Sequence, residues 1–309
     1  MQFETALEPE RYYRWRVSED RPSDGAVLST PLHLVTILYR SSKSFPKFLE
    51  GLLGQDRTDW RLHIIDNGDP VSAALAEARA DPRISISRNH ANFGFARAAN
   101  QGLRMALAEG ATAMVLINND IIMPPDLLSA LGQAERQFPG AVLSPRIMEA
   151  DTPGVGGYAG ASMRKSWIFE NVRHPYDPSV TQPQLVDFAP GCCLLVPASA
   201  LAKVGFLDER FFVYWEDTDF CMRLKQAGIA IYYLPLISIL HKGAESSGGL
   251  FNPTYIKHYY SSYIQFLKKH FGMAEAVTSM LRLMRQDWER RKFSDLGVKT
   301  RAMLSGLMR

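Results

Sequence analysis

The run LHLVTILY at residues 32–39 is the first of four short apolar runs, and together these runs indicate the fold. They are rich in the branched apolar residues that β-strands favour, and the other three are LHIID at 62–66, ISIS at 84–87 and MVLIN at 114–118. Stretches with helical patterning separate them, at 45–55, 71–80 and 96–109. Strands that alternate with helices in this way predict an α/β fold with a doubly wound, mostly parallel sheet and helices on both faces.

Polar residues follow the predicted strands directly. In a doubly wound sheet, ligands bind beyond the carboxyl ends of the strands, where the strand order reverses. The residues at these ends are therefore candidates for a binding site. They are Tyr39 and Arg40, Asp66 and Asn67, and Asn118, Asn119 and Asp120.

The composition is that of an ordinary soluble protein, with 309 residues, 46% of them hydrophobic and 22% charged. The longest apolar run, 229–240, is broken by Pro235 and falls short of the roughly 20 residues that a spanning helix needs. The N-terminus shows no apolar stretch that resembles a secretory signal. Two of the three cysteines, Cys192 and Cys193, are adjacent, which suits neither a disulfide framework nor a zinc site with spaced ligands. These features predict a protein of the reducing cytoplasm.

The chain divides into three predicted parts. Residues 1–30 are polar and lack a clear period, which indicates an N-terminal arm. Residues 31–250 form the main domain, with halves at 31–140 and 141–250. Residues 251–309 turn helical and form a C-terminal extension.

The C-terminal extension is basic and amphipathic. From residue 250 onward the chain holds eleven Lys/Arg and four acidic residues, a net charge of +7. One predicted helix face carries Val277, Met280, Leu281, Met284 and Trp288. This face suits either an anionic membrane surface or packing on the main domain or on a second subunit of a homo-oligomer. The extension has no recognised nucleic-acid module, and we expect no nucleic acid to bind.

The motif LINND at 116–120 ends a predicted buried strand in polar side chains. Mg²⁺ is usually held by one or two carboxylates together with substrate phosphates, so Asp120 suits a divalent cation. A plain strand-to-helix turn is the alternative, because Pro124, Pro125 and Asp126 look like a helix start.

The motif FFVYWEDTDFCMRLKQAG at 211–228 leads aromatic residues into Glu216 and Asp217 at a predicted helix start. Neighbouring carboxylates in an apolar setting have pKa values that are pushed apart, which makes one of them a usable base. A simple helix cap by Asp217 or Thr218 stays open as the alternative.

The remaining motifs are HKGAESSGG at 241–249 and NFGFARAANQG at 92–102. His241 directly follows a predicted strand, and imidazole is a common metal ligand, although a histidine there is also an ordinary surface residue. Small residues open the helix that follows Asn92, where close backbone approach lets a phosphate bind. No glycine fingerprint follows the first strand, which disfavours a dinucleotide oxidoreductase.

Taken together in their order along the chain, the four motifs resemble family 2 glycosyltransferases of the GT-A fold, in particular the rhamnosyltransferase-like branch that builds bacterial surface polysaccharides. The resemblance is most specific in GCCLLVPASALAKVGFLDERFFVYWEDTDFCMRLKQAG at 191–228. It implies an inverting transfer of a sugar from a nucleotide diphosphate donor, dTDP-rhamnose or a UDP-sugar, to a hydroxyl of a glycan or lipid-linked acceptor. It also implies Mg²⁺ or Mn²⁺ as cofactor. A lipid-linked acceptor and the basic extension together predict a peripheral protein at the inner face of the plasma membrane.

The resemblance assigns roles on the donor side. Asp66 matches the acid that contacts the nucleobase, and Asp120 matches the metal-binding acid of the DXD motif, with His241 completing the metal site. The expected nucleotide-sugar contacts are Tyr39, Arg40, Asp66, Asn67, Asn92, Asn100, Asn119 and Asp120.

On the acceptor side, Asp217 matches the catalytic base, with Glu216, Trp215 and Gly191 facing the acceptor. The sequence departs from the family at Asn118, where many members have an acid. This departure leaves open the alternative of a catalytically silent nucleotide-sugar-binding or assembly protein.

Overall fold

The computed structural model describes residues 31–68, 73–150, 157–166, 168–242, 252–289 and 296–308. The predicted arm at 1–30 and most of the HKGAESSGG motif lie outside these ranges. Within them, the helices lack the combination of length and apolar character that crossing a bilayer requires.

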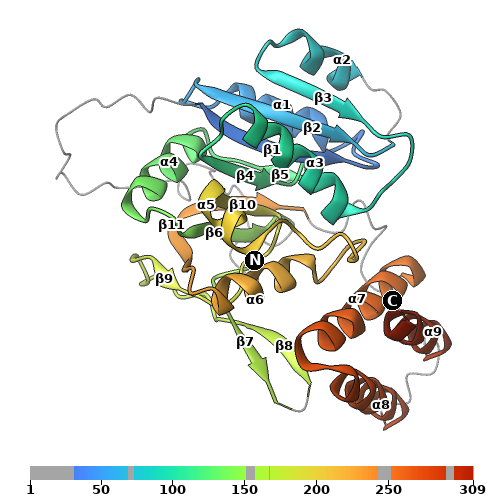
Figure 1. Cartoon of the computed structure of the whole chain (residues 1–309). Helices are drawn as coiled ribbons and strands as arrows, with labels where there is room; N and C mark the ends of the chain where they lie inside the picture. Colours follow the sequence, from blue (N-terminus) through green and yellow to red (C-terminus); the bar gives the residue numbers. More distant parts are fainter. Residues whose placement is uncertain are drawn as a thin grey trace, which may run out of the picture.

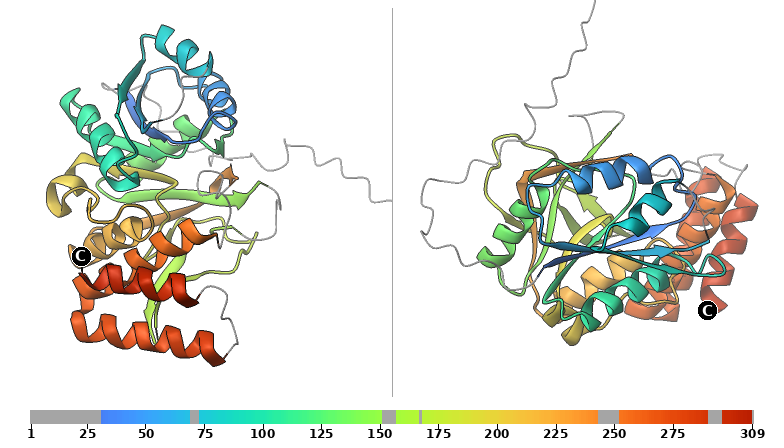
Figure 2. Two further views of the ribbon diagram at one scale, coloured as in Figure 1. Left: turned by 90° about the vertical axis from the view of Figure 1, so that its right-hand side faces the viewer. Right: turned by 90° about the horizontal axis from the view of Figure 1, so that it is seen from above.

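The first half of the sheet is parallel and doubly wound (Figure 1). Its strands run in the order β3-β2-β1-β4, and they are β1 (Leu32–Leu38), β2 (Trp60–Asp66), β3 (Ile84–Arg88) and β4 (Ala113–Ile117). The connecting helices are α1 (Phe45–Leu53), α2 (Ala73–Ala80) and α3 (Phe95–Ala108). The chain steps outward from β1 to β3 and then returns to β4, so right-handed crossovers put α1 and α2 on one face and α3 on the other, as Figure 2 shows. The predicted α/β fold is confirmed, and the strand order reverses between β1 and β4.

The second half of the sheet is mixed. Strand β10 (Cys193–Pro197) runs antiparallel between β4 and β6 (Val142–Glu149), and β11 (Ile231–His241) pairs in parallel with β6. The short strands β5 (Ile121–Ile122) and β9 (Gln184–Leu185) pair antiparallel with β11. Because β10 is reversed, its first residue, Cys193, lies beside Ile117 at the carboxyl end of β4. We call the carboxyl ends of β1 and β4, together with the start of β10, the switch edge.

Three helices and a separate β-hairpin complete the described part of the main domain. They are α4 (Leu127–Gln137), α5 (Ala198–Val204), α6 (Glu216–Gln226) and a separate hairpin of β7 (Ala161–Lys165) and β8 (Phe169–Arg173). The hairpin contacts the C-terminal helices, since the Tyr263 hydroxyl accepts a hydrogen bond from the Phe169 backbone N–H at 3.2 Å.

Three helices end the chain and stack on one another beyond the sheet (Figures 1 and 2). They are α7 (Pro253–Phe271), α8 (Met273–Glu289) and α9 (Leu296–Met308). Asn252 caps α7 by accepting a hydrogen bond from the Tyr255 N–H at 2.9 Å. Side chains of α7, α8 and α9 form a second apolar cluster that also contains Phe211 and Trp215 from the main domain. The predicted domain boundary at residue 250 stays a prediction.

Candidate active site

An acid and an imidazole meet at the switch edge. Strand β5 pairs with the end of β11 so that Ile121 lies opposite His241, which brings Asp120 beside that histidine. The Asp120 Oδ1 and His241 Nε2 atoms are 3.2 Å apart. Both atoms are buried, and neither has a hydrogen-bond partner within the described ranges. A cation between them would satisfy both.

A second carboxylate is tied to the same edge through β10. The Asn118 N–H donates to the Cys192 carbonyl at 2.8 Å, which fixes the segment before β10 against the end of β4. The next backbone N–H, that of Gly191, donates to Asp217 Oδ2 at 3.1 Å. Burial raises the pKa of the Cys192 thiol, and the nearby charges of Asp120 and Asp217 raise it further. Asp120, which pairs with His241, and Asp217 thus both lie near Cys192 at the switch edge, although the three residues come from distant parts of the chain.

The two carboxylates at the start of α6 differ in their hydrogen bonds. Asp217 accepts from the Gly191 N–H, and its Oδ1 accepts from the Thr218 N–H at 2.7 Å and the Thr218 hydroxyl at 3.3 Å. Burial raises the pKa of Asp217, while these donors oppose the rise. Burial raises the pKa of Glu216 well above its usual value, with the charge of Asp217 as the next cause, and its Oε2 atom has no partner among the described residues. Both pKa values are therefore raised, that of Glu216 more than that of Asp217, because the hydrogen bonds to Asp217 favour its ionised form.

A strained turn directly precedes these two carboxylates in the chain and sets the start of α6. Tyr214 and Trp215 both have positive φ, 67° and 68°, a conformation that costs about 1 kcal/mol or more for each non-glycine residue. The turn buries the indole ring of Trp215 against Phe169 and Tyr263. Trp215 is 6% exposed, and its indole Nε1 has no hydrogen-bond partner among the described residues, so its contact with the acceptor stays a prediction.

An ion cluster holds α6 in place and was missed in the sequence. Asp219, fully buried, lies 2.9 Å from Arg223 and 2.7 Å from His270 near the end of α7. Burial favours a higher pKa for Asp219, but the hydrogen bond to His270 and the charges of Arg223 and Lys269 lower it. Arg223 follows Asp219 by four residues on the same helix, but Lys269 and His270 lie about fifty residues further along the chain, so the cluster could not be predicted from the sequence.

The predicted nucleobase side lies at the ends of β1 and β2. Leu38, the last residue of β1, pairs with Asp66, the last residue of β2, so the next residue, Tyr39, lies close to Asp66. Asp66 is fully buried; its Oδ1 accepts from the Gly68 N–H at 3.2 Å and its Oδ2 lies 3.2 Å from Arg88 Nε. The guanidinium of Arg40 is 5.3 Å from the centre of the Tyr39 ring. Arg88, the last residue of β3, belongs to this group and could have been found as one more polar strand end.

Asn67 and Asn92 hold a loop instead of facing outward. The Asn67 amide N–H donates to Asn92 Oδ1 at 2.8 Å, and the Asn67 oxygen accepts from Asn89 and from the Phe93 N–H. Asn92 Oδ1 also accepts from the Gly94 N–H at 2.9 Å, directly before α3. These bonds shape the start of α3, which supports a positioning role for both residues.

Asn119 and Asn100 are likewise committed to the protein. Asn119 donates to the Ile37 carbonyl and accepts from the Ser44 hydroxyl at 2.8 Å. Asn100 is fully buried, and its amide bonds the Leu207 N–H and carbonyl at 3.0 and 2.8 Å. Side chains used in this way have no group directed at a donor, which corrects the prediction that these two asparagines contact the nucleotide sugar.

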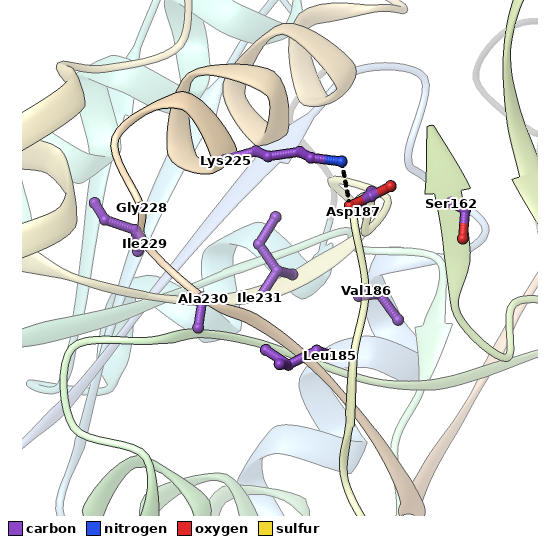
Figure 3. Close-up of a pocket in the computed structure, with 9 residues that line it drawn as sticks. All are labelled: Ser162, Leu185, Val186, Asp187, Lys225, Gly228, Ile229, Ala230 and Ile231. Atoms are coloured by element: carbon purple, nitrogen blue, oxygen red, sulfur yellow. Dashed lines mark hydrogen bonds and ion pairs between the residues drawn. The ribbon is translucent and has the colours of Figure 1, made fainter. Parts of the chain in front are cut away.

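A cavity of about 330 Å³ lies away from these residues, near β9 and the end of α6 (Figure 3). Lys225 and Asp187 pair across it at 2.6 Å. No predicted site residue lines it.

The fold is that of the GT-A glycosyltransferases. The solved structure of GalNAc-T7 with UDP, GalNAc and Mn²⁺ matches 89% of this chain with a TM-score of 0.64 and 12% sequence identity. The chain spans 56% of that longer protein, and at this identity the likeness shows the fold alone.

The family follows from the sequence comparison. Residues 34–205 match glycosyl transferase family 2, and the chain belongs to that family. It is 27% identical over 265 residues to an N-acetylglucosaminyl-diphospho-decaprenol L-rhamnosyltransferase of Mycobacterium tuberculosis, covering 78% of this chain and 85% of that relative. It is 24% identical over 178 residues to the dTDP-rhamnosyl transferase RfbF of Shigella flexneri, covering 56% of each. The predicted glycosyltransferase class is confirmed.

Proposed function

We propose that this glycosyltransferase is metal-dependent and inverting, and that it moves rhamnose from dTDP-rhamnose to a hydroxyl of a lipid-linked glycan. The observation that carries the proposal is the meeting of Asp120 and His241 with Asp217 at the switch edge. The rhamnosyl donor and the lipid-linked acceptor are supported by the names of the two relatives. A UDP-hexose is the second candidate donor.

Asp120 and His241 are the residues that would hold Mg²⁺ or Mn²⁺. Their facing atoms are buried, 3.2 Å apart and without other partners in the described ranges, so the donor set fits a cation that takes oxygen and imidazole ligands. Such an ion, when bound, neutralises the charge that develops on the leaving diphosphate. Near the same edge, Asp66 and Tyr39 are placed to receive the base of the nucleotide.

Asp217 is the proposed base. Its Oδ1 and Oδ2 atoms are held by backbone N–H groups, so the carboxylate is fixed in orientation before a substrate arrives. It takes the proton of the acceptor hydroxyl as that oxygen attacks the anomeric carbon from the side opposite the diphosphate. Attack from that side inverts the configuration. Removal of the proton by a positioned base contributes roughly 10²- to 10⁴-fold in rate.

A panel of nucleotide sugars tests the proposal. With Mn²⁺ present, dTDP-rhamnose should raise the midpoint of thermal unfolding more than UDP-hexoses do, and should support transfer to an N-acetylglucosaminyl-diphospho-lipid acceptor. NMR of the product should show an inverted anomeric centre. Retained configuration, or transfer that is unchanged by chelation of divalent metal, would remove the proposed chemistry.

We also propose that α8 rests on an anionic membrane surface at the cytoplasmic side. The predicted apolar stripe is split in the structure: Met280 is buried, whereas Leu281 and Trp288 are 57% and 67% exposed. Arg285 shares their helix face, being four residues after Leu281 and three before Trp288. Arg285 also pairs with Glu289 at 2.6 Å, so the proposal depends on the exposed apolar residues and on the net basic charge of the whole extension, which suit the interface of an anionic bilayer.

Vesicle flotation tests this second proposal. The double variant Leu281→Ser and Trp288→Ser should lose binding to vesicles that contain phosphatidylserine. Leu53→Ser, which changes an exposed leucine on α1, is the matched control and should bind like the wild type. Equal flotation of the double variant would favour packing against protein instead.

A further inference from the structure

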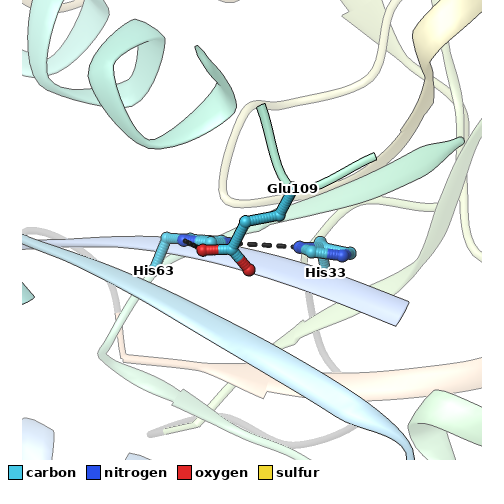
Figure 4. Close-up of side chains that lie close together, drawn as sticks. All are labelled: His33, His63 and Glu109. Atoms are coloured by element: carbon cyan, nitrogen blue, oxygen red, sulfur yellow. Dashed lines mark hydrogen bonds and ion pairs between the residues drawn. The ribbon is translucent and has the colours of Figure 1, made fainter. Parts of the chain in front are cut away.

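Figure 4 shows a group of side chains that could ligate a metal and that does not include any residue of the proposed active site. His33 is the second residue of β1, His63 lies within β2, and Glu109 caps the C-terminal end of α3. One ligand atom from each residue lies within 4.8 Å of the others. We infer that His33, His63 and Glu109 form a binding site for a divalent transition-metal ion of the Zn²⁺ type.

The packing of α3 builds this group. Val35 pairs with His63, and His33 lies two residues before Val35, so all three side chains share one face of the sheet. A Cβ on Gly102 would approach Val35 Cγ1 to 2.3 Å, so the glycine lets α3 lie close on that face. The last turn of α3 therefore covers the two imidazoles and brings Glu109 to them. The C-terminal end of a helix carries partial negative charge, which favours a cation there.

Hydrogen bonds orient the imidazoles as ligands. His63 Nδ1 is 2.8 Å from the Ser85 hydroxyl, and that hydroxyl in turn reaches the Leu62 carbonyl at 3.5 Å. The hydroxyl therefore donates to the carbonyl and accepts from His63 Nδ1–H, which leaves the lone pair on His63 Nε2. That atom faces His33 Nδ1 at 2.9 Å. Without an ion, His33 Nδ1–H donates the hydrogen that the two nitrogens share. When an ion takes its place, the His33 proton moves to Nε2, so ligation by the imidazoles releases no net proton. An outer partner that fixes the histidine tautomer in this way is usual at metal sites.

The spacing and charge of the group fit an ion after a small adjustment. Two nitrogen ligands on a tetrahedral ion are about 3.3 Å apart, so the rings need to separate by roughly 0.4 Å. Glu109 Oε1 lies 3.9 Å from His63 Nδ1, the nitrogen that bonds Ser85, so the glutamate side chain must turn toward the ion to become the third ligand. This side chain is 46% exposed, which leaves it room to move and gives the ion a route from solvent. Burial lowers the pKa of His63 to about 4, Glu109 opposes this shift, and His33 and Arg61 add to it. Burial also lowers the pKa of His33, so both imidazoles are neutral ligands at neutral pH.

Zinc titration of the full chain, freed of any histidine tag and without nucleotide, tests the inference. Calorimetry should show a saturable Zn²⁺ site in the wild type that persists in His241→Ala, and Co²⁺ at this site should give the visible absorption of a tetrahedral ion. Glu109→Gln leaves the buried histidine pair intact and should weaken Zn²⁺ binding at least tenfold. His63→Gln should abolish it.

Two control variants separate this site from others. Glu77→Gln changes an exposed glutamate on α2 and should bind Zn²⁺ like the wild type. His241→Ala should also keep this site, because His241 belongs to the switch edge. Absence of saturable Zn²⁺ binding, or binding that Glu109→Gln leaves unchanged, would overturn the inference and leave His33 and His63 as a plain hydrogen-bonded pair.

Discussion

Replacing Asp217 by asparagine removes the proposed base while keeping the shape of the side chain. Transfer should fall by about 10²- to 10⁴-fold, which is an increase in the activation free energy of about 2.7 to 5.4 kcal/mol. Nucleotide binding in the presence of Mn²⁺ should be unchanged, since Asp217 is held by Gly191 and Thr218 on the acceptor side. Steady-state transfer and calorimetry with the nucleotide measure the two quantities separately.

The same hydrogen bonds set the effect of this variant on stability. Backbone N–H groups bind both carboxylate oxygens of Asp217, so the amide NH₂ of asparagine must face one of them. A buried donor left without an acceptor lowers the free energy of unfolding by about 1–3 kcal/mol. A domain with about 5–15 kcal/mol of stability stays folded, so unfolding does not account for the loss of transfer. Asp177→Asn, at an exposed aspartate, is the control. Turnover within tenfold of the wild type, or loss of nucleotide binding in Asp217→Asn, would refute the assignment.

Three further variants probe the rest of the site. Asp120→Asn should weaken nucleotide binding at least about tenfold when Mn²⁺ is present and leave metal-free binding unchanged, as measured by calorimetry; an equal loss in both would contradict a metal role. Thr218→Val removes one of the donors to Asp217 and should raise the pKa of Asp217 further. Since transfer needs ionised Asp217, the fall of kcat/KM with decreasing pH should begin at a pH that is higher by less than about one unit. Thr218→Ser keeps the hydroxyl and should keep the wild-type pH profile. Asn100→Ala should lower the free energy of unfolding by about 1–3 kcal/mol in chemical denaturation and leave the donor KM unchanged; a large rise in KM would restore Asn100 to the donor site.

The parallel half of the fold could be predicted because its central strands, β1, β2 and β4, are buried on both faces. All seven residues of β1 are buried, and such strands read as continuous apolar runs in the sequence. The reversed direction of β10 and the β7–β8 hairpin left no comparable signal, because an apolar run does not encode the direction of its neighbours. The gathering of Asp120, His241 and Asp217 was predicted only through the resemblance to a family.

The asparagines show where residue type alone stops being informative. A polar side chain after a strand, like Asn119, or in the first turns of a helix, like Asn100, either points into the crevice or bonds neighbouring backbone, and the residue type is the same in both cases. Asn100 and Asn119 bond their neighbours because buried backbone groups of Leu207 and Ile37 need partners. His33 and His63 raised no expectation for a similar reason, since they occupy positions in apolar strands that any core residue could fill.

Anomalous diffraction from a crystal grown with Mn²⁺ and a nucleoside diphosphate tests the central claim most directly. We expect a Mn²⁺ peak at about 2.0–2.3 Å from both Asp120 Oδ1 and His241 Nε2, with the diphosphate on the ion and Asp217 on the opposite side of the sugar position. A nucleotide bound at the switch edge with its metal ion remote from Asp120 and His241 would contradict it.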